Sequence, residues 1–225
     1  MEQLNSLANG LLELIYPRRA ICVGCGAMAG QDREWLCEVC RRNLADRWIG
    51  AGQPPEGGLF DGAAYAYRYG GPVAGMVRSL KYRGVRLLAE PMGRHMAHAY
   101  EAIRPTPVDC VVPVPMYVRR LRERGFNHAA LLADQVARRL ELPVMNVLER
   151  TRDTRQQARL GEAERLTNLD GAFSLREQVS ERHVLLVDDV CTTGATANAC
   201  ARVLLGGGVA SVWLLCFATA IGERK

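Results

Sequence analysis

The sequence predicts an α/β fold in which a mainly parallel sheet is flanked by helices and preceded by a small metal-binding module. Two runs, residues 109–112 and 184–190, have the apolar, β-branched composition of strands buried on both faces of a parallel sheet. A helical pattern over residues 195–205 follows the second run, and alternating strands and helices are typical of this fold class. A chain of 225 residues can hold one such domain and a small appendage.

The junction between the second strand and this helix carries the most specific chemistry. The apolar run ends in Asp188 and Asp189. A short loop of small and hydroxyl-bearing residues follows, which contains Thr192, Thr193, Gly194, Ala195 and Thr196. A helix that begins at such a loop leaves backbone N–H groups unpaired, and these groups favour a phosphate.

The two aspartates indicate that the ligand carries more than a phosphate. Carboxylates repel phosphate, but they accept strong hydrogen bonds from vicinal hydroxyl groups. A ribose 5-phosphate satisfies both parts of the motif, with its diol on Asp188 and Asp189 and its phosphate in the loop. The alternative is an ordinary strand end followed by an N-capping aspartate or threonine.

Four cysteines near the N-terminus have the spacing of a metal site. They form two CxxC pairs, Cys22 with Cys25 and Cys37 with Cys40. Each pair can place two thiolates on one ion, and together they complete a tetrahedral four-sulfur site without an open position. The spacing therefore predicts a structural zinc ion, and a redox-active CxxC pair is the alternative.

Composition and charge limit the possible cellular compartment and the kinds of binding partner. No secretory signal is evident, and the apolar stretch at residues 4–16 is interrupted by polar side chains and too short to span a bilayer. We expect it to form an amphipathic helix, in a cytoplasmic protein without membrane insertion. Eight cysteines then indicate metal binding or buried thiols rather than disulfides. The net charge of +5 permits a polyanionic partner.

A stretch rich in proline and glycine separates the N-terminal module from the rest. Residues 50–58 predict a hinge between a helix and zinc ribbon at 1–50 and a main domain at 51–225. Within the main domain, helical patterns predict helices at residues 73–82 and 87–103.

Tyrosines alternate early in the main domain. Tyr65, Tyr67 and Tyr69 have the spacing of a strand with one aromatic face. Exposed tyrosines can stack on the bases of single-stranded DNA. Packing in the core is the more ordinary role of aromatic residues in strands, and both interpretations remain open at this point.

Basic residues are candidates for holding further phosphate groups of the ligand, such as a pyrophosphate. The arginine-rich residues 119–128 follow the first strand, so they are expected at the carboxyl edge of the sheet, where open α/β folds bind ligands. We expect Arg119 to contact pyrophosphate, since arginine holds phosphate groups bidentately; a solvated basic helix face is the alternative. The polar residues 150–168 suit a mobile lid, or else a plain surface loop. Arg155 in this stretch and Lys81, a compact charge in an arginine-rich chain, can also approach the pyrophosphate.

Residues 184–196 resemble the phosphoribosyl pyrophosphate (PRPP) signature of type I phosphoribosyltransferases, in which an acidic pair holds the ribose hydroxyls and the loop holds the 5-phosphate. Taken end to end, the sequence resembles the ComF family. The matching segments are the two CxxC pairs, residues 80–84, 113–115 and 124–127, a pattern of polar residues over 150–173, and residues 187–196. His128 is a departure, because glutamine is usual there in the family.

This resemblance implies a type I phosphoribosyltransferase fold with an N-terminal zinc ribbon, and a site that binds PRPP with magnesium. It also implies a role in natural transformation, in which imported single-stranded DNA is handled together with a helicase partner. The alternative is an active phosphoribosyltransferase that transfers ribose 5-phosphate to an unidentified acceptor, with Asp188, Asp189 and Lys81 as catalytic residues. A third interpretation is an adaptor whose phosphosugar site is vestigial.

Overall fold

A parallel sheet forms the centre of the structure, which is a computed structural model that describes residues 21–29, 35–103, 107–153, 169, 171–180 and 182–221. The strands lie in the order β1-β6-β5-β2. They are β1 (Gly62–Arg68), β2 (Cys110–Pro113), β5 (His183–Cys191) and β6 (Ser211–Thr219). All neighbouring pairs are parallel, so the predicted sheet is confirmed.

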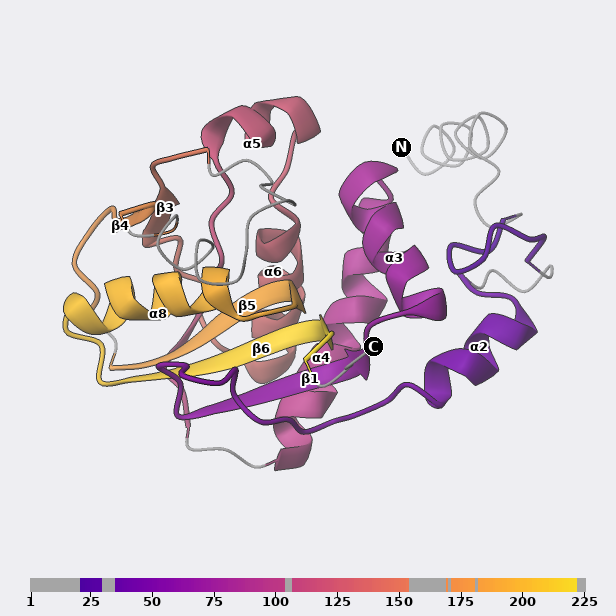
Figure 1. The fold of residues 1–225 in the computed structure, drawn as a ribbon, viewed down its shortest axis with the longest axis horizontal. Helices are drawn as coiled ribbons and strands as arrows, with labels where there is room; N and C mark the ends of the chain where they lie inside the picture. Colours follow the sequence, from indigo (N-terminus) through magenta and orange to yellow (C-terminus); the bar gives the residue numbers. More distant parts are fainter. Residues whose placement is uncertain are drawn as a thin grey trace, which may run out of the picture.

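Helices cover both faces of this sheet (Figure 1). They are α2 (Glu38–Ala45), α3 (Gly71–Tyr82), α4 (Ala89–Ile103), α5 (Val118–Arg124), α6 (His128–Leu140) and α8 (Ala195–Gly206). One apolar cluster joins α4 and α6 to one face, and a second joins α8 to the other. A hairpin of β3 (Leu148–Arg150) and β4 (Phe173–Leu175) packs with α8. No helix among the described residues has the length and apolar character that crossing a bilayer requires.

The strand β5 shows why its sequence is continuously apolar. Leu185 and Val187 belong to the cluster beneath α4 and α6, whereas Val184 and Leu186 belong to the cluster beneath α8. Because successive side chains point to opposite faces, a strand covered on both faces needs apolar residues at every position. After His183, the next polar residues occur only where the strand reaches the carboxyl edge.

Most predicted helix bounds are confirmed. The helix expected at 73–82 is α3, and the one expected at 195–205 is α8. The helix expected at 87–103 is divided, because a short 3-10 helix (Arg86–Leu88) precedes α4. Pro91 lies in the first turn of α4, where a missing backbone N–H breaks no hydrogen bond.

The described part of the N-terminal module packs directly on α3. Cys22 and Leu44 share one apolar cluster with Val77. A Cβ atom built on Gly75 of α3 would lie 2.4 Å from the carbonyl oxygen of Gly24, so this close contact requires glycine. The division at residue 50 stays a prediction, and the predicted helix at residues 4–16 lies outside the described residues.

The tyrosines of β1 pack in the core. Tyr65 and Tyr67 are only 2% and 4% exposed. The single aromatic face is wrong, because Tyr65 packs in the cluster beneath α8 and Tyr67 packs in the cluster with α4. The Tyr67 hydroxyl lies 2.6 Å from Nδ1 of His95 on α4, which gives its buried polar end a partner. Neither ring is available to stack on a base in this conformation.

Candidate functional site

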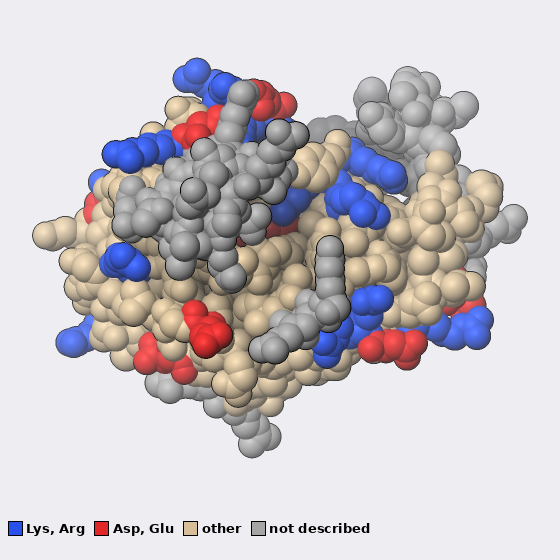
Figure 2. Space-filling model, in the orientation of Figure 1, with Lys and Arg blue, Asp and Glu red and all other residues tan. Residues whose placement is uncertain are grey.

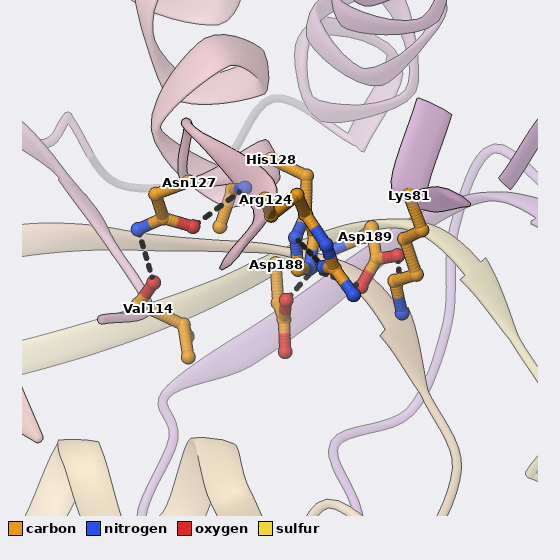
Figure 3. Close-up of polar contacts among 8 residues, drawn as sticks. Lys81, Val114, Arg124, Asn127, His128, Asp188 and Asp189 are labelled. Atoms are coloured by element: carbon orange, nitrogen blue, oxygen red, sulfur yellow. Dashed lines mark hydrogen bonds and ion pairs between the residues drawn. The ribbon is translucent and has the colours of Figure 1, made fainter. Parts of the chain in front are cut away.

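The candidate site lies where β5 extends beyond its neighbour β2. The last pair in that register joins Pro113 to Val187. Asp188 and Asp189 come next on β5, so the acidic pair stands at the carboxyl edge of the sheet. Side chains from α3 and α6 reach this position, as Figure 3 shows. This is the edge at which open α/β folds bind ligands.

Asp189 is buried between side chains from two helices. Its Oδ2 lies 2.6 Å from Nζ of Lys81 on α3, and its Oδ1 lies 3.4 Å from Nε2 of His128 on α6. Burial alone would raise the pKa of Asp189, but His128 and Lys81 outweigh it and hold this pKa below its ordinary value. Burial would likewise lower the pKa of Lys81, and the charges of Asp189 and Asp188 raise it instead. Asp189 and Lys81 are therefore both charged at neutral pH.

Asp188 has a different environment. Its side chain (Figure 3) lines a cavity of about 60 Å³ together with the loop that follows β5. Its Oδ1 accepts a hydrogen bond of 2.8 Å from the backbone N–H of Asp189. Burial and the neighbouring charge of Asp189 raise the pKa of Asp188 to about 8. The two adjacent acids thus have opposite pKa shifts.

A fixed turn between α5 and α6 places His128. Gly125 ends α5 with a φ of 78°, a conformation that favours glycine. Asn127 then caps α6, since its side chain accepts a hydrogen bond from the backbone N–H of Ala129. The same side chain donates through Nδ2 to the carbonyl oxygen of Val114 at 3.0 Å. The start of α6 is therefore fastened to the end of β2.

Sequence reasoning missed His128 as a site residue. In the sequence it stands out only as a departure from the family pattern, yet it contacts Asp189 directly. The signal that could have found it is its position: a polar residue at the start of a helix that follows a strand end at the ligand-binding edge. His128 is also held by Arg124, whose Nη1 lies 3.0 Å from Nδ1 of the ring.

The loop predicted to hold a phosphate lies beside Asp188. The cavity is lined by residues that include Thr192, Thr193, Gly194, Ala195 and Thr196, so the structure brings these together with Asp188. Gly194 is the N-cap of α8 and has a φ of 78°. The first N–H groups of a helix have no intrahelical partner, which suits an anion at this end of α8.

Residues 50–58, predicted as a hinge, pack against this loop. A Cβ atom built on Gly194 would lie 2.4 Å from Cβ and Cγ of Pro55, which is buried. Just beyond this stretch, the backbone N–H of Leu59 donates a 3.0 Å hydrogen bond to Oδ1 of Asn198 on α8. The segment thereby supports the loop that begins α8.

The predicted pyrophosphate ligands are not all brought to the cavity. Arg119 is exposed on α5, where its Nε lies 3.1 Å from Oε1 of Glu123 and 4.0 Å from Oδ2 of Asp153. In the described part of the chain, Arg119 is not among the residues that line the cavity. Arg155 and most of the predicted lid lie outside the described residues. Pyrophosphate contacts by these side chains, and by Lys81, stay predictions.

The four cysteines meet in one cluster. The Sγ atoms of Cys22, Cys25, Cys37 and Cys40 all lie within 4.8 Å of one another, and those of Cys25 and Cys37 are 3.8 Å apart. Tetrahedral zinc with Zn–S bonds of about 2.3 Å places its sulfur atoms roughly 3.8 Å apart. Burial opposes ionisation of Cys22, but hydrogen bonds from backbone N–H groups lower its pKa to about 6. The cluster can therefore hold a zinc ion, as its spacing predicts.

Comparison with known proteins places this architecture in a family. Residues 127–225 match the model of the phosphoribosyl transferase domain. The DNA utilization protein YhgH of Escherichia coli (strain K12) is 32% identical over 208 residues, which cover 87% of this chain and 89% of that protein. Competence protein F of Haemophilus influenzae is 40% identical over 108 residues, covering 46% and 47%. Competence protein ComFC of Bacillus subtilis is 25% identical over 207 residues, covering 89% and 84%. The chain belongs to the ComF family.

The ComF-family relationship covers more of the chain than the transferase domain does. The domain match begins at Asn127, so it includes His128, the acidic pair and the phosphate loop. Lys81 and the four cysteines precede it. Because the Escherichia coli relative aligns with 87% of this chain, most of the sequence before the domain is shared as well. The type I phosphoribosyltransferase fold with an N-terminal zinc-ribbon cluster is therefore the architecture of this family member.

Proposed function

We propose that this ComF-family protein binds PRPP with Mg²⁺ beside Asp188 and acts in natural transformation, in the handling of imported single-stranded DNA. The observation that carries the proposal is a shared cavity, which is lined by both the Asp188 carboxyl group and the loop that begins α8. A ribose diol donates hydrogen bonds to a carboxylate, and a phosphate binds at a helix N-terminus. A pentose that carries both groups fits this arrangement.

The donor set also suits magnesium. Mg²⁺ prefers oxygen ligands and is commonly held by one or two carboxylates together with the phosphates of a substrate. Asp188 is the carboxyl group that the cavity offers for this purpose. When bound, the ion neutralises the charge of the diphosphate. The chain itself fixes the 5-phosphate through the loop and keeps the Lys81 ammonium beside the acidic pair.

Calorimetric titration with PRPP tests the ligand assignment. We expect binding in the presence of Mg²⁺ and none after its removal, because the diphosphate charge is then uncompensated. The double variant Asp188→Asn, Asp189→Asn should abolish binding, and Thr193→Val should weaken it. Thr151→Val is a matched control, since Thr151 follows β3, is not among the described residues that line the cavity, and donates to the carbonyl oxygen of Gly171. Unchanged binding by the double variant would reject the site.

The DNA-handling role is supported by the relatives and by an exposed surface. Relatives are named DNA utilization protein and competence protein. Tyr82 at the end of α3 is 70% exposed, and the Arg124 guanidinium lies 5.0 Å from the centre of its ring. Figure 2 shows Lys and Arg side chains over α5 and beside the end of α3. Cationic groups and exposed aromatic rings are what a single strand requires, and the family resemblance adds a helicase as a proposed partner.

Salt dependence tests the DNA role independently of PRPP. Affinity for a short single-stranded oligonucleotide, followed by fluorescence anisotropy, should fall steeply as salt rises, because phosphate contacts release counterions. Tyr82→Ala should weaken binding, whereas Arg138→Met on α6 should not. An affinity that is absent or independent of salt would defeat this part of the proposal.

An active phosphoribosyltransferase is the second candidate, favoured by the carboxyl group of Asp188 in the cavity. Departure of pyrophosphate leaves positive charge on the anomeric carbon of the ribose, and a nearby carboxylate stabilises that charge. Asp188, Asp189 and Lys81 would then be the catalytic residues. Pyrophosphate release should be screened with nucleobases and single-stranded DNA as acceptors. Binding of PRPP without release for any acceptor would favour the adaptor interpretation.

A further inference from the structure

We infer that the two neighbouring acids have separate roles. Asp189 links β5 to α3 and α6 through its contacts with Lys81 and His128, and His128 holds the Asp189 carboxyl group in position. Asp188 alone presents its carboxyl group to the ligand. The inference rests on the proposed PRPP site and refines it, because the sequence motif treats the two acids as equivalent ligands for the ribose hydroxyls.

The two carboxyl groups lie close together but have different surroundings. Asp188 and Asp189 are successive residues of β5, and one oxygen of each lies within 4.8 Å of the other and of a ring nitrogen of His128. Asp188 lines the cavity at the start of α8. The Asp189 side chain is 3% exposed, and each of its oxygens already has a partner, Lys81 on one side and His128 on the other. Both carboxyl oxygens of Asp189 therefore already contact side chains of the protein itself.

The contact between Arg124 and His128 fixes the tautomer of the histidine. Arginine carries only hydrogen-bond donors. Because Nη1 of Arg124 lies 3.0 Å from Nδ1 of His128, Nδ1 must be the acceptor. The proton of the neutral ring is then on Nε2, the atom that lies 3.4 Å from Oδ1 of Asp189. His128 thus donates a hydrogen bond to the charged carboxylate.

These contacts close into a ring. Lys81 on α3 binds Asp189 on β5, Asp189 accepts from His128 on α6, and His128 accepts from Arg124 at the end of α5. Arg124 then stacks on Tyr82, the residue next to Lys81. The ring therefore begins and ends on α3. It fixes the end of β5 relative to three helices, and so sets the direction in which Asp188 faces the cavity.

Substitutions at His128 test its positioning role, with PRPP and Mg²⁺ as the probe. His128→Leu removes the hydrogen bond that holds Asp189 in place, so it should weaken PRPP affinity by roughly 10- to 100-fold. His128→Gln keeps an N–H donor and should stay within about threefold of wild type. Rescue by glutamine distinguishes the hydrogen bond from mere filling of space. His98→Leu, at an exposed histidine on α4, should bind PRPP as wild type does.

Two outcomes would overturn the inference: wild-type affinity in His128→Leu, or equal losses in His128→Leu and His128→Gln. If His128→Leu does not fold, Arg124→Met removes the donor to Nδ1 from the exposed side and should weaken affinity as well; wild-type affinity there would also overturn it.

The single aspartate variants separate this inference from the proposed function. Asp189→Asn should lower the thermal unfolding midpoint of the ligand-free protein, because it removes the partner of the buried Lys81 charge. Asp188→Asn should not lower it. Absence of PRPP binding by the wild-type protein would defeat the proposed function while leaving this contrast measurable. Equal loss of stability in both variants would sink the assignment of separate roles.

Discussion

The cysteine cluster and the acidic pair at the end of β5 both bring ionisable groups close together, but the charges are compensated in different ways. The four cysteines come from one short segment, residues 22–40, and their geometry fits an ion supplied from solution. Asp189 is instead compensated by the chain itself, through Lys81 from α3 and His128 from α6. The first arrangement is suited to a metal ion, and the second depends on the packing of three elements.

Because of this difference, we expect the cysteine cluster to affect mainly folding stability and the acidic pair to affect mainly ligand binding. The cluster shares its apolar core with α3, so loss of the ion should disturb the fold. At the end of β5, Lys81 and His128 compensate the charge of Asp189, whereas Asp188 has a raised pKa and lies beside the cavity. Perturbed carboxyl groups in a cleft are common at functional sites. Variants in the two regions should therefore differ in size of effect and in what they change.

Removal of zinc should have the largest effect. Structural zinc contributes on the order of 10 kcal/mol in zinc-finger peptides at neutral pH. Purified protein should carry about one zinc ion per chain, and a strong chelator should lower its thermal unfolding midpoint markedly. Cys40→Ser should do the same, because it breaks the cluster at a buried position.

Cys200→Ala is the matched control, since this thiol is also buried but lies in α8, outside the cluster. It should keep its zinc and lose only a little stability. Metal-free protein with an unchanged unfolding midpoint would contradict the structural role of the cluster.

Gly194→Ala, in the loop that begins α8, should have the next largest effect on stability. The positive φ of 78° strains any other residue, and the new Cβ would lie 2.4 Å from Pro55. Backbone strain of this kind costs about 1–3 kcal/mol, and displacement of Pro55 adds to it. We expect lower stability by denaturant unfolding and a loss of PRPP affinity by calorimetry. Gly208→Ala is the control, because Gly208 also has positive φ but open space around its Cβ position. Equal losses in both variants would show that the Pro55 contact contributes nothing.

Asp188→Asn should stabilise the ligand-free protein. The pKa of Asp188 is raised from 3.8 to about 8 in the folded chain, so the folded state binds the proton more tightly than the unfolded state. Ionisation therefore favours unfolding, and this contribution to stability is lost as pH rises from about 4 to about 8. Asparagine keeps an oxygen that can accept the Asp189 N–H and has no charge to bury. Its unfolding midpoint should exceed that of wild type by roughly 3 °C or more at pH 7.5.

The gain should shrink towards pH 4.5, where the wild-type carboxyl group is protonated in the folded chain. Asp189 has the opposite shift but is present in both proteins, so it does not account for a difference between them. If the unfolding midpoints of the two proteins differ by the same amount at every pH in this range, burial does not raise the pKa of Asp188.

The features that could be predicted from the sequence are formed by residues close together in the chain. Contacts between elements that are distant in the chain could not be predicted. The cysteine cluster and the loop at Gly194 follow from residues close together in the chain, and their chemistry could be predicted from spacing alone. The parallel sheet could be predicted because β5 is apolar at successive positions. The contacts of Asp189 could not, because Lys81 and His128 meet it only after α3 and α6 have packed on the sheet. Spacing likewise did not predict that Tyr65 and Tyr67 pack in different clusters.

Arg119→Met should have the smallest effect on stability, and it tests the predicted contact between Arg119 and a pyrophosphate. Arg119 is half exposed and pairs with Glu123 within α5. Surface ion pairs of this kind contribute about 0–1 kcal/mol, so the free energy of unfolding should barely change. A loss of PRPP affinity without a loss of stability would then identify Arg119 as a pyrophosphate ligand. Arg122→Met on the same helix controls for the general loss of positive charge, and equal affinities for the two variants would remove Arg119 from the site.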